Sequence, residues 1–251
     1  MAIRAVLFDL GDTLWGFAGD LEGAVLAQYR RAYADIRDLD GWPAPERLMQ
    51  AVVEQLRAAR IAYSSEPGLH QQQPTETLVA AALSAFGLLM PRASVARLTD
   101  IIFRAEEALA LKQPPEPEMV GAVAGLRQRG LRLGCVSNNV MSAAQIGDIL
   151  AARGLAPYFE CIVSSAEAGY RKPHRGCFEP ALQALDVAAC ECVFVGDRLD
   201  ADVAGAGALG MTAVLTQQYR CEDPAGSEAT ADFVIRHLRE LGACLDRLAT
   251  P

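Results

Sequence analysis

Four side chains have the types and spacing of a phosphoryl-transfer site: Asp9, Lys172, Asp197 and Asp202. Asp9 directly follows the apolar run 5–8, and a carboxylate at the C-terminal end of a buried strand lies where open α/β sheets bind ligands. Neighbouring carboxylates repel one another, so a hard cation is their natural neutraliser, and oxygen ligands suit Mg²⁺. A cation and a lysine beside hydroxyl and amide donors would stabilise a transferring phosphoryl group.

Two residues with hydrogen-bonding side chains, Ser137 and Asn138, follow the apolar segment 131–136 and supply such donors. Taken singly, these residues also have a structural interpretation. Ser and Asn are common in turns, and Asp202 near a helix start would interact favourably with the helix dipole. We favour the functional interpretation because these stretches together supply all the parts of one phosphoryl-transfer site.

The hydrophobic pattern predicts a scaffold that brings these strand ends to one edge. Apolar, strand-forming runs lie at 5–8, 131–136, 161–164, 192–195 and 212–215, with a short sixth at 233–235. Helical patterns lie at 118–129, in a segment up to Arg153, and at 178–185, 201–209 and 238–248. Strands that alternate with helices imply right-handed βαβ units. We therefore predict an α/β fold, with a three-layer Rossmann-like core around a parallel sheet.

The stretch between the first strand and the rest has a different pattern. Helical periodicity recurs over 21–39, 48–59, 76–86 and 94–111, whereas the polar segment 63–74 is expected to be a loop. The proline-rich segment 113–117 then stops the last helix. We predict an α/β core of residues 1–14 and 115–251, and an inserted, all-helical domain of residues 15–114 with hinges at both ends.

Composition narrows the class of protein. The chain has 251 residues and a net charge of −8, which argues against nucleic acid as a partner. No apolar run reaches membrane-spanning length, and no secretory signal is recognisable at the N-terminus. The seven cysteines lack zinc-site spacing and are expected to be free thiols. We expect a cytoplasmic protein that acts on a small molecule, without a nucleic-acid or membrane partner.

The motifs FDLGDTL, VSNN, RKP and VGDRLDADVAGAGALGM occur in this order along the chain. Each is weak alone, but together they resemble the haloacid dehalogenase-like (HAD) superfamily of hydrolases. The resemblance covers about 1–14 and 115–245. It implies that the helical insertion is a cap of the family's first type, termed C1.

The resemblance also implies a role for each acidic residue. Asp9 would be the nucleophile and would form an aspartyl-phosphate. Asp9 and Asp197 would bind Mg²⁺, with the carbonyl group of Gly11 as a third ligand. Asp202 would support the metal site.

The remaining motif residues would bind the phosphoryl group. Ser137, Asn138 and the adjoining backbone would hold the phosphoryl oxygens, and Lys172 would neutralise both Asp9 and the transferring group. Phosphoryl transfer depends mainly on positioning and charge stabilisation, which agrees with these roles.

One position departs from the family's phosphatases, in which the second residue after the nucleophile is usually an aspartate that protonates the leaving alcohol. Here this residue is Gly11, and Asp12 follows it. General acid–base catalysis contributes about 10²–10⁴-fold, so alkyl phosphates should suffer most and acyl phosphates least. Asp12 would replace the acid only if the loop turned it toward the cleft; otherwise it caps the loop or faces solvent.

Three functions remain open. A Mg²⁺-dependent phosphatase acting on a small phosphorylated metabolite is favoured, because the acidic motif around Asp197 and Asp202 is retained. A carbon–halogen dehalogenase also uses an aspartate nucleophile and needs no acid for the leaving halide. A protein that has lost catalysis and only binds a phosphorylated ligand is the non-enzymatic alternative. The phosphonatase branch is disfavoured because its Schiff-base lysine has no counterpart within 15–111.

Overall fold

The computed structural model describes residues 2–16, 70–110, 116–223 and 227–249, and parts of 44–58. The chain separates into two compact units, one formed by Met1–Phe17 with Pro114–Pro251 and the other by Ala18–Gln113. The helix expected over 21–39 lies outside the described residues, as does most of the loop expected over 63–74.

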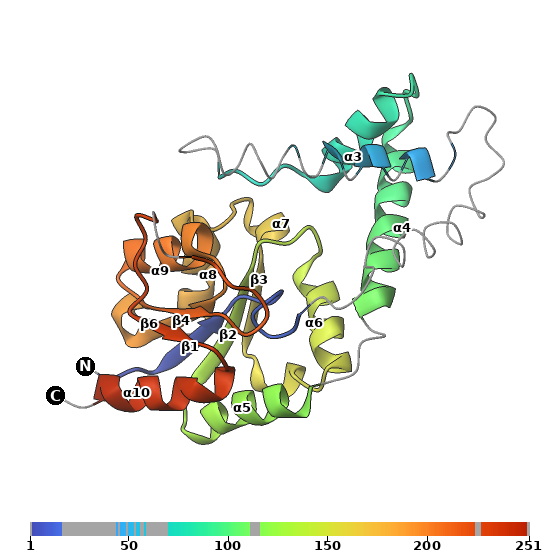
Figure 1. Cartoon of the computed structure of the whole chain (residues 1–251). Helices are drawn as coiled ribbons and strands as arrows, with labels where there is room; N and C mark the ends of the chain where they lie inside the picture. The colour runs from blue at the N-terminus through green and yellow to red at the C-terminus, as the bar shows by residue number, and fades with distance from the viewer. Residues whose placement is uncertain are drawn as a thin grey trace. The chain divides into compact units, whose positions relative to one another are not determined.

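The larger unit is built on a six-stranded sheet with the order β3-β2-β1-β4-β5-β6 (Figure 1). All neighbouring strands run parallel, which confirms the predicted α/β class. The strands are β1 (Ala5–Phe8), β2 (Arg132–Ser137), β3 (Cys161–Ser164), β4 (Cys192–Gly196), β5 (Thr212–Thr216) and β6 (Phe233–Ile235). Each expected strand is present, within one residue at either end.

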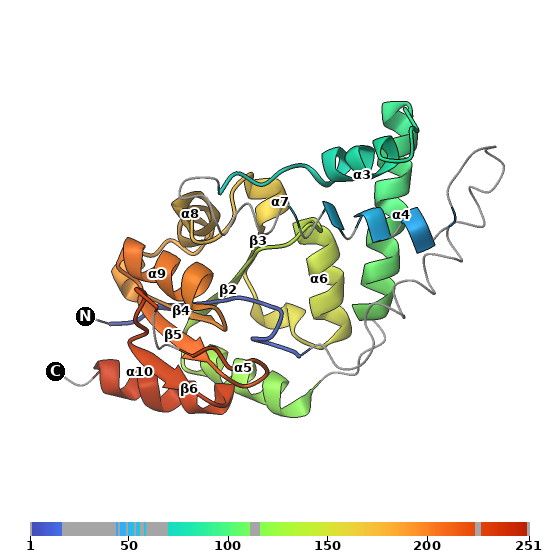
Figure 2. The same ribbon diagram turned by 45° about the horizontal axis from the view of Figure 1, so that its top comes forward.

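Helices cover both faces of this sheet. They are α5 (Pro117–Gln128), α6 (Ala143–Ala152), α7 (Ser165–Ala168), α8 (Arg175–Ala184), α9 (Ala204–Leu209) and α10 (Leu241–Ala249). Helices α8 and α9 lie on one face and α5 and α10 on the other, in both views (Figures 1 and 2). Phe178 of α8 stacks edge-on against Phe194 of β4 within a fully buried cluster. The sheet is therefore the middle of three layers.

Strand β1 lies at the centre of the sheet because its side chains are apolar on both faces. All four residues of Ala5–Phe8 are 0% exposed. Phe8 is paired with Cys135 on one side and Val195 on the other. The next residue on each of these strands therefore lies at the same edge, which is how Asp9 comes to stand beside the ends of β2 and β4.

Three helices differ from the sequence prediction, and that expected over 238–248 opens as a 3-10 turn, Leu238–Glu240, before α10. The helix expected over 178–185 already begins at Arg175, because the Nδ1 atom of His174 accepts the Gly176 N–H and caps it. The helix expected over 201–209 opens as a π-helical turn, Leu199–Val203, before α9. The short helix α7 was not predicted at all; four residues carry too little periodicity to detect.

The smaller unit is helical in its described part. Helices α3 (Thr75–Ser84) and α4 (Arg92–Ala110) agree with the expected 76–86 and 94–111 within two residues. Its core joins these helices to helical residues of the segment 46–58, through Leu48, Val52, Val79, Ala82, Leu83, Val95 and Leu98. Among the described residues of the whole chain, no helix is both long and apolar enough to cross a membrane.

Candidate active site

Lys172 is the buried centre of the site. Its Nζ atom lies 2.6 Å from Asp9 Oδ1 and 2.7 Å from Asp202 Oδ1, and the lysine side chain is 2% exposed. Burial lowers the pKa of Lys172, but Asp202 and Asp9 outweigh this and hold the pKa above its usual range. The lysine is therefore a permanent cation between two acids that lie far apart in the sequence.

Asp197 completes a group of three carboxylates. Asp9, Asp197 and Asp202 each offer one oxygen atom, and these atoms lie within 4.8 Å of one another. Burial, together with the charges of Asp202 and Asp9, raises the pKa of Asp197 to about 7 against the opposing effect of Arg220. Burial also raises the pKa of Asp9 to about 6, although Lys172 opposes the shift. One ammonium group does not neutralise three acids.

This donor set fits a magnesium ion, because three oxygen donors converge and their charge exceeds that of Lys172. Asp202 is the least available ligand. Its Oδ1 faces Lys172, and its Oδ2 accepts the Arg198 N–H at 3.0 Å. Asp9 and Asp197 would hold the ion, with Asp202 in support, as the resemblance implied.

A glycine makes room for this arrangement. A Cβ atom on Gly196 would lie 2.3 Å from the carboxyl group of Asp202, a distance that no real contact allows. The Gly-Asp pair at the end of β4 thus positions two carboxylates. Gly196 leaves space for the carboxyl group of Asp202, and Asp197 is the next residue.

Asp197 has two further neighbours that sequence reasoning did not select. The Thr13 hydroxyl lies 3.5 Å from Asp197 Oδ1, and Arg220 Nη1 lies 3.5 Å from Oδ2. Thr13 is fully buried and belongs to the FDLGDTL motif, so the sequence could have identified it as a site residue. Arg220 follows β5 outside any motif, and nothing in the sequence marked it.

The two residues predicted at the end of β2 have different environments. Ser137 is buried, and its backbone pairs with Ser164 of β3. The Asn138 side chain is bound to the backbone of Lys172: its Oδ1 accepts the Lys172 N–H at 2.7 Å, and its Nδ2 donates to the Lys172 carbonyl at 3.1 Å. The Asn138 amide therefore places the lysine. Further along, the Asn139 N–H donates to Ser165 Oγ at 3.0 Å, and the N–H groups of Val140 and Met141 donate to Asn139 Oδ1.

The turn after Asp9 explains the backbone conformation of Asp12. Gly11 pairs with Trp15 in an isolated bridge, and the Asp12 N–H donates to the Trp15 carbonyl at 2.8 Å. Asp12 has a φ of 56°, a left-handed conformation that Asp tolerates better than most residues. Within the described part of the chain, its carboxylate does not join the group formed by Asp9, Asp197 and Asp202. The conformation of Asp12 thus serves the turn.

Comparison with known proteins agrees with this geometry. Residues 3–210 match the family model described as haloacid dehalogenase-like hydrolase. The chain is 34% identical over 244 residues to a phosphoserine phosphatase of Thermus thermophilus, covering 95% of this chain and 90% of that protein. It is 27% identical over 249 residues to a glyceraldehyde 3-phosphate phosphatase of Methanopyrus kandleri, covering 95% of each.

A solved structure shows the same fold. The 2-haloacid dehalogenase from Pseudomonas syringae pv. Tomato DC3000 is similar with a TM-score of 0.72 and 24% identity, over 98% of this chain and 99% of that one. The match to the family model extends over most of the chain and includes every residue of the acid–lysine group. The chain therefore belongs to the haloacid dehalogenase-like hydrolases.

Proposed function

We propose that this hydrolase is a Mg²⁺-dependent phosphatase that acts on a small phosphorylated metabolite through an aspartyl-phosphate on Asp9. The observation that carries the proposal is the buried group of three carboxylates around one lysine. Buried acids are costly unless they are paired or bind a metal, and here the acids outnumber the one buried ammonium group that pairs with them. The two relatives named above as phosphatases support the choice of substrate class.

In this mechanism an Asp9 oxygen attacks phosphorus while the bond from phosphorus to the leaving oxygen breaks. Lys172 opposes the effect of burial on Asp9 and keeps more of it ionised, and it also neutralises the entering phosphoryl oxygens. The Ser137 hydroxyl, with the adjoining backbone of Asn138, would orient those oxygens. When bound, Mg²⁺ would neutralise further charge on the phosphoryl group. Water then attacks the phosphorus of the aspartyl-phosphate, which releases phosphate and restores the Asp9 carboxylate.

The residue at position 11 sets the preferred leaving group. Gly11 has no side chain to protonate a departing alkoxide, and the backbone of Asp12 is part of the turn. Leaving groups that are stable as anions need no such proton. We therefore infer that acyl phosphates and esters of acidic alcohols are hydrolysed faster than simple alkyl phosphates.

We further propose that the helical insertion of residues 15–114 acts as a cap with hinges at both ends. A cap that closes over the site excludes bulk water and contacts the part of the substrate beyond the phosphoryl group. Under this proposal the insertion selects the metabolite, and the chemistry stays with the core unit.

The dehalogenase is the second candidate because of Gly11, since a halide leaves without a proton. It would hydrolyse a carbon–halogen bond through an ester on Asp9. The gathering of three carboxylates around a single buried lysine favours phosphoryl chemistry instead, because halide displacement makes no use of a bound metal ion.

One set of assays separates the candidates. Acetyl phosphate, p-nitrophenyl phosphate and a haloacid are each incubated with the protein, with Mg²⁺ or with a chelator. We expect phosphate release that requires Mg²⁺ and is faster from acetyl phosphate than from an alkyl phosphate. Halide release that survives chelation would identify a dehalogenase. Mg²⁺ binding without turnover of any substrate would identify a ligand-binding protein.

A further inference from the structure

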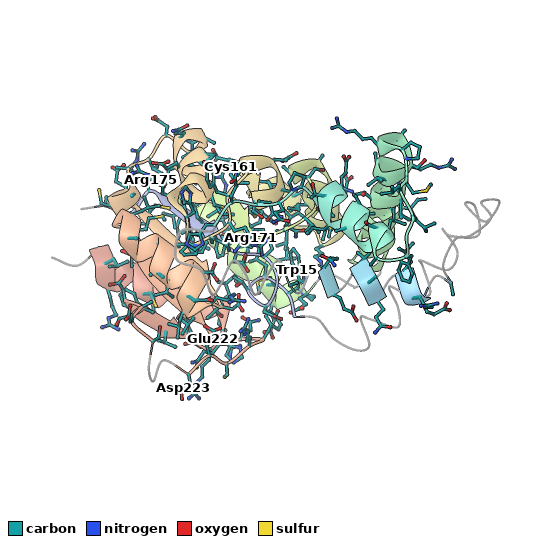
Figure 3. All side chains as sticks on the ribbon, turned by 90° about the horizontal axis from the view of Figure 1, so that it is seen from above. Trp15, Cys161, Arg171, Arg175, Glu222 and Asp223 are labelled. Carbon is teal, nitrogen blue, oxygen red and sulfur yellow. The ribbon has the colours of Figure 1, made fainter. Side chains whose placement is uncertain are left out.

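A loop that no catalytic motif includes holds the turn that carries two of the acids. This loop, residues 217–222, follows β5 and is called here the β5 loop; Glu222 and the adjoining Asp223 can be located in Figure 3. The turn, residues 197–202, follows β4 and is called the acid turn. Strands β4 and β5 are neighbours in the sheet, so the two segments leave the same edge side by side.

Two side chains of the β5 loop contact the acid turn. Glu222 accepts the Leu199 N–H at its Oε2 atom at 2.6 Å and binds Arg220 Nη2 at its Oε1 atom at 2.8 Å. Arg220 in turn directs Nη1 toward Asp197 Oδ2 at 3.5 Å. The acid turn is thus held at Asp197 and at Leu199, the first residue of the π-helical turn that carries Asp202.

The β5 loop has its own anchors on the opposite side. The Tyr219 hydroxyl bonds to Glu116, and the Tyr219 ring would lie 2.6 Å from a Cβ atom on Gly16. Gln218 Oε1 accepts the Leu238 N–H at 2.8 Å. Because the loop is fixed by contacts that do not involve the acids, it is a support for the acid turn.

We propose that Arg220 and Glu222 are positioning residues for the candidate metal site, and that they set its affinity for Mg²⁺ by holding the acid turn. The inference rests on the proposed function for the identity of the cation. Partners that orient metal ligands typically contribute about 10–100-fold to metal affinity. A substrate-binding role for Arg220 is less favoured because two carboxylates, Asp197 and Glu222, already face its guanidinium group.

The decisive variant is Arg220→Lys, assayed by calorimetric titration with MgCl₂. Arg220→Gln would remove a positive charge near the site, which by itself attracts the cation and hides any loss of orientation. Lysine keeps the charge but lacks the planar fork that reaches Asp197 and Glu222 together. We expect the Kd for Mg²⁺ to rise about tenfold. For Glu222→Gln, which keeps an oxygen for the Leu199 N–H, we expect a rise of about threefold.

The matched control is Arg4→Lys. Arg4 binds Glu191 at 3.1 Å, and the same Glu191 oxygen accepts the Ala188 N–H at 3.0 Å, so the chemistry of this pair repeats that of Arg220 and Glu222 at the other edge of the sheet. Its Kd for Mg²⁺ should equal that of the wild type. Circular dichroism and the Tm of each variant report whether the fold is kept.

Three outcomes overturn the inference. An unchanged Kd for Mg²⁺ in folded Arg220→Lys refutes positioning, and an accompanying rise in KM would assign Arg220 to substrate binding. A tenfold loss of Mg²⁺ affinity in Arg4→Lys as well would show that these substitutions weaken binding through the whole fold and not through the acid turn. If the wild type binds Mg²⁺ but hydrolyses no phosphate, the proposed function fails, while the titrations still decide the role of Arg220 and Glu222. A wild type that binds no Mg²⁺ refutes both.

Discussion

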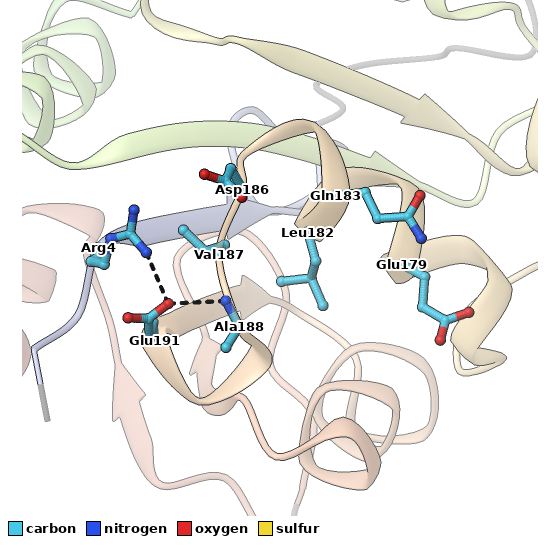
Figure 4. A pocket seen from close by; sticks show the side chains of 8 residues that line it. All are labelled: Arg4, Glu179, Leu182, Gln183, Asp186, Val187, Ala188 and Glu191. Carbon is cyan, nitrogen blue, oxygen red and sulfur yellow. Dashed lines mark hydrogen bonds and ion pairs between the residues drawn. The ribbon is translucent and has the colours of Figure 1, made fainter.

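The two edges of the sheet in the larger unit carry the same kind of ion pair and differ in what surrounds it. At the C-terminal edge Glu222 joins Arg220 to a backbone N–H group, and at the N-terminal edge Glu191 joins Arg4 to another (Figure 4). The C-terminal pair stands beside three gathered carboxylates and a buried lysine. The N-terminal pair lines a surface pocket with the exposed Asp186.

This difference shows that burial of charge distinguishes the edge that carries the candidate site, and ion-pair geometry does not. An exposed pair contributes about 0–1 kcal/mol to stability and is common on any protein surface. A buried charge costs several kcal/mol before its partners compensate. Among the described residues, the three buried carboxylates and the buried lysine gather at one edge, where the pKa of Asp197 is raised to about 7 and that of Asp9 to about 6.

The largest expected effect tests the nucleophile. Asp9→Asn keeps the size of the side chain but removes the attacking carboxylate, so hydrolysis of acetyl phosphate should fall by at least about 10⁴-fold. Phosphate release is measured at saturating Mg²⁺. Glu191→Gln makes the same chemical change at the other edge and should keep full activity. Activity that persists in Asp9→Asn would mean that another group attacks.

Removing the buried cation comes next. Lys172→Met leaves Asp9 and Asp202 facing each other without a counter-ion, so kcat should fall about 10²–10³-fold. Breaking a buried pair on one side also destabilises by about 3–5 kcal/mol. Both kcat and the denaturant midpoint are measured, and Arg4→Met serves as the comparison at the exposed pair. A Lys172→Met protein of unchanged stability would contradict the buried network described here.

A substitution at position 11 is expected to increase activity. Gly11→Asp adds a carboxyl group where the related phosphatases have their acid, and turnover of alkyl phosphates should rise about tenfold or more if the missing proton limits the rate. Acetyl phosphate should gain little, so the ratio of the two rates is the readout. Gln183→Glu adds a negative charge beside the N-terminal pocket as a control. Equal rates in folded Gly11→Asp and wild type would show that protonation of the leaving group is not limiting.

Acidic pH should weaken Mg²⁺ binding. Asp197 and Asp9 have raised pKa values, so protons compete with the cation as the pH falls through about 7 and then about 6. We expect the Kd to rise up to about tenfold per pH unit per proton displaced. Titrations in buffers of different ionisation enthalpy count those protons. A Kd that stays constant from about pH 8 to about pH 5.5 would contradict the raised pKa values.

The raised pKa values of Asp197 and Asp9 also predict how the free energy of unfolding changes with pH. Without bound metal the folded protein keeps protons on Asp197 and Asp9 at pH values where the unfolded chain has released them. Its free energy of unfolding should therefore fall as the pH rises from 3.8, the ordinary Asp value, to about 7. Saturating Mg²⁺ should reverse this trend, because the cation binds the ionised form. Melting curves at several pH values, with and without Mg²⁺, test the reversal.

How much of this site the sequence predicts depends on whether a residue acts locally. Asp9, Asp197 and Lys172 each lie within a recognisable motif, and the parallel order of the strands brings these motifs together. Arg220 and Glu222 follow β5 without any motif, and they contact the acid turn only because β4 and β5 pair side by side. Such contacts between loops arise from tertiary structure, which hydrophobic periodicity does not encode.

The fold shows the same division. Strand β1 was predictable because its apolar run is buried on both faces. The π-helical turn at Leu199 was not, since it follows from the Leu199 N–H bonding to Glu222 and from Asp202 accepting the Arg198 N–H. The first of these contacts joins two loops, so the sequence of the acid turn alone predicts an ordinary helix.

The smallest expected effect lies at the N-terminal pair. Glu191→Gln keeps an acceptor for the Ala188 N–H and removes one charge of an exposed pair, so the free energy of unfolding should stay close to that of the wild type. High salt should reduce even that difference, because exposed charges are screened. Denaturant titrations at low and high salt measure it. A loss of several kcal/mol, or a loss of Mg²⁺ binding, would show that the two edges are coupled through the sheet, and burial of charge would then no longer distinguish them.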